Sequence, residues 1–127
     1  MIDKEDEIFD AVAKKLREKF PEIYVVGTEI VSAPPRFPSV SFVQTNNAIE
    51  TRHSTFDSLE NVVKEEYKAE VFSNLTKGKD AQTKEITKVI SDVMCEFHYE
   101  RTFCEPIPNA DATISRRISR YTNRNVI

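Results

Sequence analysis

Residues 61–75, NVVKEEYKAEVFSNL, decide the fold class because apolar and charged side chains alternate along them. One set of alternate positions includes Val63, Tyr67 and Val71, whereas the other set is charged through its middle, as at Lys68. Successive side chains of a strand point to opposite faces of a sheet, so this stretch predicts a strand with one face toward the core and one toward water. At about 3.3 Å per residue it would span roughly 50 Å, so we expect one end to project or to pair with a neighbouring subunit.

An amphipathic helix is predicted on either side of this strand in the sequence. In residues 3–20 apolar side chains recur every four positions, and in residues 80–97 they recur at spacings of three and four. Both spacings place the apolar residues on one helical face. Asp3 and Asp80 stand where a helix N-cap is expected, and Pro21 ends the first helix.

Four further strands are predicted from runs rich in β-branched and aromatic residues, at 23–31, 40–45, 99–104 and 112–121. Residues 46–59 are polar without a clear period and are expected to form a mobile loop, and prolines predict a turn over 105–110. The order α-β-β-β-α-β-β favours a two-layer α+β sandwich, in which a mostly antiparallel sheet of about five strands carries both helices on one face. Residues 1–127 are expected to form a single domain.

Composition excludes several classes of protein. Gly27 and Gly78 are the only two glycines, so a glycine-rich phosphate loop cannot form. Two cysteines, Cys95 and Cys104, are too few for a disulfide framework, and the acidic start MIDKEDE is unlike a signal peptide, so a reducing compartment is expected. No apolar run approaches the roughly 20 residues of a membrane span. A net charge of −3 gives no overall attraction to nucleic acid or to anionic membranes.

One alternative hypothesis is that the protein is a Mg²⁺-dependent nuclease. Glu66-Tyr67-Lys68 matches the acid-x-Lys pattern of such nucleases, whose core has a similar order of elements, with Asp57 as the second carboxylate. The strand before this motif holds no acid, however. Alternating Lys and Glu are also the ordinary surface of an exposed strand.

Other candidate sites are weaker. Cys95, His98 and Cys104 supply three ligands where a structural zinc site needs four, so no metal site and no cofactor are predicted. A third hypothesis is a nucleic-acid-binding or adaptor domain that uses the arginine-rich stretch 114–124. It lacks the interleaved aromatic residues of a stacking platform for bases.

Several stretches taken together resemble a known family. They are FP at 20–21, the proline-rich PPRFP at 34–38 that leads into VSFVQ, VFSN at 71–74, PIPN at 106–109 and ISRRISRY at 114–121. In this layout the sequence resembles the small tail terminator (tail completion) proteins of long-tailed bacteriophages and prophage-derived tails.

The resemblance implies a structural virion protein and no enzymatic activity. Proteins of this family form a ring, expected here to be a homohexamer, on the head-proximal end of the tail tube. The ring stops tube polymerisation and presents the docking surface for the head–tail connector protein. The resemblance further implies assembly in the bacterial cytoplasm and residence in the virion tail, with no membrane and no small-molecule substrate, and with DNA only as cargo passing through the ring. A head-completion or connector protein of the same assembly is the alternative within this class.

The uneven charge of the chain suggests where copies meet. Residues 50–70 carry six acidic and three basic side chains, whereas the basic C-terminal strand and tail, 112–127, carry four arginines and no acid. Opposite charges favour self-association through complementary surfaces. We also expect the loop 46–59 to become ordered on the tail tube. The residues expected at the interface with another subunit or with the tail tube are Arg116, Arg117, Arg120, Arg124, Glu65, Glu66 and Glu70.

Overall fold

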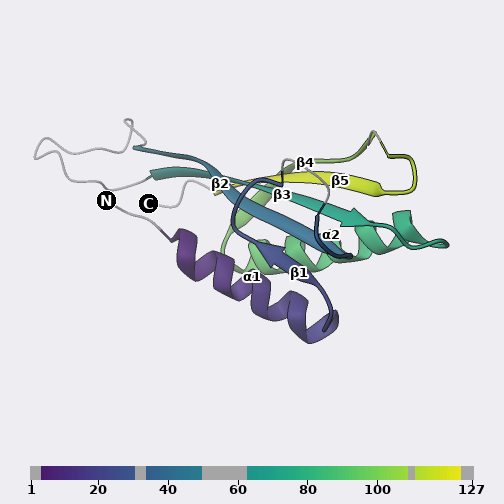
Figure 1. Ribbon diagram of the computed structural model, residues 1–127. Helices are drawn as coiled ribbons and strands as arrows, with labels where there is room; N and C mark the ends of the chain where they lie inside the picture. The colour runs from purple at the N-terminus through teal and green to yellow at the C-terminus, as the bar shows by residue number, and fades with distance from the viewer. Residues whose placement is uncertain (1–3, 31–33, 50–62, 109–110, 124–127) are drawn as a thin grey trace, which may run out of the picture.

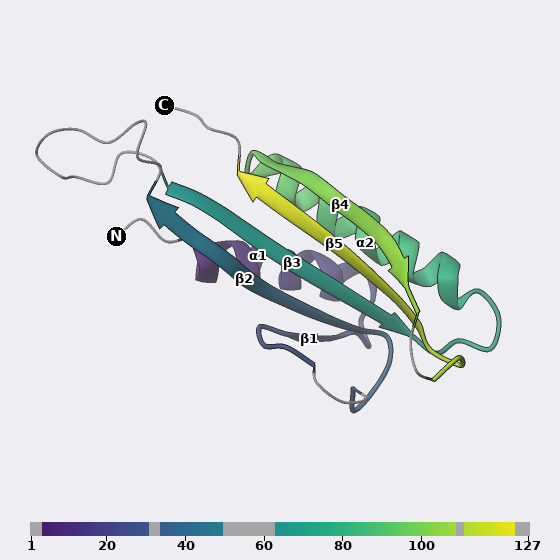
Figure 2. The ribbon, with the colours of Figure 1, turned by 90° about the horizontal axis from the view of Figure 1, so that it is seen from above.

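Two helices cover one face of a five-stranded sheet in the computed structural model (Figures 1 and 2). The structure describes residues 4–30, 34–49, 63–108 and 111–123. The predicted α+β class and the order α-β-β-β-α-β-β are confirmed. The elements are α1 (Glu5–Lys19), β1 (Tyr24–Val26), β2 (Ser39–Ile49), β3 (Val63–Ser73), α2 (Lys79–Glu96), β4 (Tyr99–Ile107) and β5 (Ser115–Asn123).

The strands lie side by side in the order β1-β2-β3-β5-β4, so the long strand β3 is central. β1 runs parallel to β2, and every other neighbouring pair is antiparallel. Parallel neighbours need a crossover connection, which the proline-rich segment between β1 and β2 supplies. β1 and β4 are therefore the two edges of the sheet.

The core lies between the sheet and the helices. Phe42 of β2 stacks on Tyr67 of β3 with ring centroids 5.3 Å apart, and the ring of Tyr99 meets Tyr67 edge-on at 5.4 Å. Burial of apolar surface here is the main favourable contribution to folding. The predicted inner face of β3 is buried from Glu65 to Ser73, whereas Leu75, after the end of the strand, is 44% exposed; both predicted helical stripes face the core. The helix residues in the core include Ile8, Val12, Leu16, Ile86, Ile90 and Met94.

β2 is longer than the sequence pattern predicts. It continues to Ile49, so the predicted loop 46–59 is wrong over residues 46–49, and its remainder lies outside the described residues. The register shifts between Gln44 and Asn46, where one extra residue forms a bulge, and pairing with β3 then resumes. The pairing persists there because the backbone of β3 supplies its hydrogen bonds, although the side chains show no apolar period.

The other strand bounds also differ in detail. β1 occupies only three residues of the predicted 23–31. β4 runs through Pro106 to Ile107, so the predicted turn over 105–110 begins too early. An edge strand tolerates proline because one side of its backbone needs no partner in the sheet. β5 is shifted along the chain from the predicted 112–121 and ends at Asn123.

Both helices begin without a side-chain hydrogen bond at the N-cap. The N-cap residues are Lys4 and Gly78, and Gly78 has a φ of 82°, which glycine adopts without strain. The predicted cap at Asp80 is therefore wrong, since this residue lies in the first turn of α2 and accepts a hydrogen bond from Ser115. Asp3 lies outside the described residues. Among the described residues no helix is long and apolar enough to cross a membrane.

Candidate functional site

A chain of ion pairs crosses the face of the sheet that the helices leave uncovered. Its centre is Glu70 of β3, which is 3% exposed. The Glu70 carboxylate lies 3.0 Å from Lys68 Nζ and 2.9 Å from Arg116 Nη2 of the neighbouring strand β5. Lys68 Nζ also lies 2.7 Å from Glu29 Oε1, in the segment after β1. Four charged groups from three segments of the chain therefore neutralise one another.

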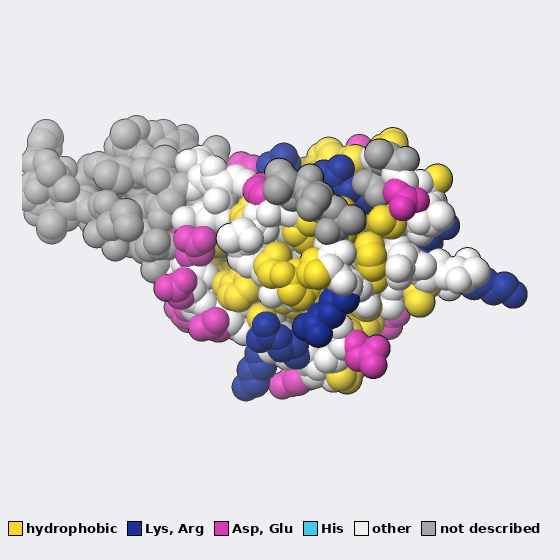
Figure 3. All heavy atoms as spheres, viewed as in Figure 1, with side chains coloured by type: hydrophobic (Ala, Val, Ile, Leu, Met, Phe, Trp, Pro, Cys, Tyr) yellow, Lys and Arg dark blue, Asp and Glu magenta, His cyan; other side chains and the backbone are white. Residues whose placement is uncertain are grey.

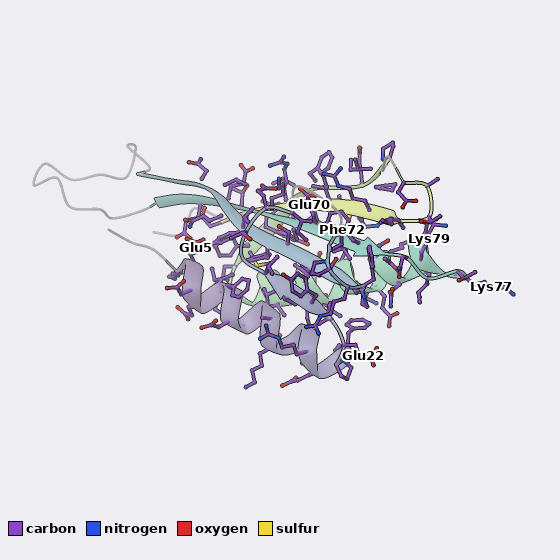
Figure 4. All side chains as sticks on the ribbon, viewed as in Figure 1. Glu5, Glu22, Glu70, Phe72, Lys77 and Lys79 are labelled. Carbon is purple, nitrogen blue, oxygen red and sulfur yellow. The ribbon has the colours of Figure 1, made fainter. Side chains whose placement is uncertain are left out.

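The segment after β1 approaches this face and helps to shield it. Ser41 Oγ donates a hydrogen bond to the carbonyl oxygen of Thr28 at 2.6 Å. The Arg116 guanidinium lies 5.8 Å from the centre of the Phe72 ring, and Phe72 is 5% exposed. Figure 4 labels Phe72 and Glu70 on the sheet. The prediction that this face of β3 looks toward water is wrong at both residues, because segments distant in sequence cover them.

Lys68 is held between two carboxylates. Burial lowers the pKa of Lys68, but its hydrogen bonds to Glu29 and Glu70 outweigh burial and raise this pKa above its usual value. Glu66 pairs with an arginine of β5 at 3.3 Å, and Asp57 lies outside the described residues. The acid-x-Lys side chains share a face, as predicted, yet each is engaged by a neighbour. In the described part of the chain no group of three or more His, Cys, Asp or Glu side chains can hold a metal ion.

Four of the residues expected at the subunit interface pair within one chain. Arg116 pairs with Glu70, and Arg120 pairs with Glu66. The partners are 46 and 54 residues apart in sequence, but β3 and β5 are adjacent strands. The side chains of Arg120 and Glu66 are 40% and 29% exposed, so this pair also remains accessible to a second molecule. Contact of these residues with another subunit stays a prediction.

The other three expected interface residues are located differently. Glu65 is 2% exposed, so its carboxylate is enclosed within its own chain and does not reach the surface. Arg117 lies on the helix side of β5, where its Nη1 is 3.9 Å from Cys104 Sγ. Arg124 lies outside the described residues.

A buried polar cluster around Glu65 is a feature that sequence reasoning missed. Glu65 Oε2 accepts hydrogen bonds from the hydroxyl groups of Tyr67 and Tyr99, both at 2.9 Å, and from Gln44 Nε2 at 3.4 Å. Burial, the neighbouring Tyr99 and the hydrogen bond to Glu65 raise the pKa of Tyr67, so its hydroxyl stays protonated and donates. The available signal was a glutamate at an inward-facing position of the strand, two residues before a tyrosine.

The three potential metal ligands noted in the sequence lie on three successive segments, and the two cysteines differ in exposure. Cys95 is exposed at the end of α2, and Cys104 is half-buried on β4; both are free thiols. His98 lies in the turn between these elements with a φ of 67°. No group that includes them is arranged to hold a metal among the residues described.

Neither a family model nor a curated protein matches this chain. The similarity to phage tail terminators therefore rests on the sequence stretches that carry it, and it stays a prediction.

Proposed function

We propose that this protein is a structural component of a phage-like tail and forms a ring, as tail terminators do. The ring caps the head-proximal end of the tail tube, stops tube polymerisation and presents the surface to which the head–tail connector protein docks. In this role the protein transforms no substrate. Its partners are copies of itself, the tail tube protein and the connector protein, and it resides in the virion tail.

The β2–β3 hairpin is the observation that carries this proposal. Pairing between β2 and β3 continues to Ile49 opposite Val63, whereas β5 pairs with β3 only as far as Glu66. The described end of the hairpin therefore extends past the adjacent strand, as the left side of Figure 2 shows. The backbone of such a hairpin offers main-chain contacts to a neighbouring subunit or to a tube end.

The location of the two sheet edges also supports a ring. β1 and β4 lie at opposite sides of the sheet, so the two flanks of the molecule carry different surfaces. A contact between unlike surfaces of successive copies generates a ring when the rotation between copies closes, and a filament when it does not.

Tubes assembled from the tail tube protein encoded in the same genome test the proposal. Added wild-type protein should stop tube growth, measured by light scattering, and should appear as extra density at one tube end in negative-stain images. Tubes that continue to grow and remain bare would overturn the proposal. Binding to isolated heads but not to tubes would instead favour the head-completion alternative.

Two variants make this test specific for the hairpin. Asn46 is exposed on β2 of the hairpin, and Asn46→Arg should weaken capping by placing a large cation there. Lys77 is exposed in the turn between β3 and α2, at the opposite tip of the molecule (Figure 4), and Lys77→Glu should cap as the wild type does.

A further inference from the structure

A groove of about 570 Å³ lies on the helix side of the sheet, between α2 and the strands β4 and β5. Four cationic side chains line it: Lys84 and Lys88 from α2, Arg101 from β4 and Arg117 from β5. The only acidic residue in its lining is Glu85. This basic groove stands out because the whole chain has a net charge of −3.

The cations of the groove are not neutralised by the part of the chain that the structure describes. Among the described residues none of the four forms an ion pair, whereas on the opposite face of the sheet Lys68, Arg116 and Arg120 all do. Lys84 and Lys88 are four residues apart on one helix, a spacing at which like charges destabilise the helix. An anionic occupant would relieve this repulsion.

Two buried polar atoms of the groove residues also lack hydrogen-bond partners. Thr87 is 3% exposed, and its Oγ1 has no partner within the described residues. The same holds for Arg117 Nε. Unsatisfied buried polar groups are costly, and they are uncommon in folded proteins unless a further group completes the site.

The start of α1 carries the complementary charge. Its first turn is acidic, and Asp6, Glu7 and Asp10 are exposed. These three carboxylates form no ion pair among the described residues. Figure 3 shows acidic side chains gathered over this end of α1, and basic side chains farther along the helix.

The acidic end and the basic groove lie on opposite flanks of the molecule. α1 packs beside α2 and beneath β2, where Phe9 meets Phe42, and α2 packs beneath β3, β5 and β4 (Figure 2). The groove opens on the flank of α2 that faces β4, away from α1. The two surfaces therefore cannot meet within one chain, but they can meet between successive copies in a head-to-tail arrangement.

We propose that the groove between α2 and β4 is a docking site for the acidic start of α1 from a second copy of this chain. The inference rests on the proposed ring and names the contact that would build it. Each copy then places the exposed acidic start of its α1 on the groove of the next copy, while α1 stays packed in its own chain.

Charge reversal tests this contact on the full chain. Variant A carries Asp6→Lys, Glu7→Lys and Asp10→Lys, and variant B carries Lys84→Glu, Lys88→Glu and Arg101→Glu. Sedimentation velocity at low salt should show that each variant alone associates at least about tenfold more weakly than the wild type, because like charges now face each other. An equimolar mixture of A and B should recover association, and so should one chain that carries both sets of changes.

If association recovers in the mixture, both variants are folded, and the loss in each variant alone is due to the contact between copies. Lys14→Glu with Lys15→Glu, on the other half of α1, is the matched control and should leave association unchanged. A wild type that stays monomeric at low salt, or a mixture that does not recover, would overturn the inference. Capping of tubes is measured separately, so normal capping by A and B would leave the proposed function standing while refuting this contact.

Discussion

The hydroxyl group of Tyr67 donates a hydrogen bond of 2.9 Å to the carboxylate of Glu65, two residues earlier on the same strand. Both side chains are almost fully buried, and a second tyrosine hydroxyl, from Tyr99 of β4, reaches the same carboxylate oxygen. A buried carboxylate is tolerated only when donors satisfy it. The cluster therefore links the central strand β3 to the edge strand β4 through side chains, although β5 lies between them in the sheet.

Loss of one tyrosine hydroxyl should measurably destabilise the fold. Tyr67→Phe removes a donor from a buried carboxylate and should lower the free energy of unfolding by about 1–3 kcal/mol, measured by urea denaturation. Tyr24→Phe, on the short edge strand, should change it by less than about 0.5 kcal/mol. Equal effects of the two substitutions would show that the hydrogen bond to Glu65 contributes little.

Alkaline pH should unfold the protein through its buried tyrosines. Burial, Tyr99 and Glu65 raise the pKa of Tyr67, and burial raises the pKa of Tyr121 although its hydrogen bond with Ser91 partly opposes this. In the unfolded chain both hydroxyls ionise near pH 10, about the usual tyrosine pKa. Stability is therefore fully present below about pH 10 and falls as the pH rises above it, because only the unfolded state releases these protons.

A spectrophotometric titration checks this expectation. Of the four tyrosines in the chain, Tyr67 and Tyr121 should form tyrosinate only together with the loss of far-UV circular dichroism. In Tyr67→Phe the onset of alkaline unfolding should become less steep, since one proton fewer is released. Reversible ionisation of all tyrosines in the folded protein would contradict the prediction.

Glu70, the central carboxylate of the ion-pair chain, should contribute more to stability than Glu66, which pairs with Arg120 outside that chain. Glu70→Gln leaves Lys68 and Arg116 without their shared buried partner and should cost about 2–3 kcal/mol, less than for a fully buried pair because both cations reach water. Glu66→Gln breaks a more exposed pair with Arg120 and should cost less than about 1 kcal/mol.

Chemical denaturation with and without added salt measures both costs. Added salt should reduce the small loss of unfolding free energy caused by Glu66→Gln. It should change the loss caused by Glu70→Gln much less, since salt screens buried charges only weakly. A larger loss at Glu66 than at Glu70 would be incompatible with the observed burial.

The nuclease alternative makes a separate prediction. Lys68 is engaged by Glu29 and Glu70, so we expect no Mg²⁺-dependent cleavage of plasmid DNA by the purified protein. Agarose gels after incubation with Mg²⁺ provide the measurement. Cleavage that is present in the wild type and lost in Glu66→Gln would replace the proposed structural role with an enzymatic one.

The local periods in the sequence were sufficient to predict the elements and the layers. Alternation over residues 61–75 marks a strand, and the recurring apolar residues of 3–20 and 80–97 mark helices, because backbone geometry alone sets the periods of two and about 3.6 residues. The inner face of the long strand and the apolar stripes of the helices followed from the same periods. The end of β2 was missed because its pairing depends on the backbone of β3 and leaves no apolar pattern.

Only the tertiary structure decided which charged residues meet. The sequence shows an acidic and a basic stretch, but their pairing within one chain follows from β5 inserting between β3 and β4. Glu70 is buried because Arg116 lies beside it on β5 and the segment after β1 brings Glu29 to Lys68. Contacts between residues so far apart in sequence depend on the path of the whole chain, which no local period encodes.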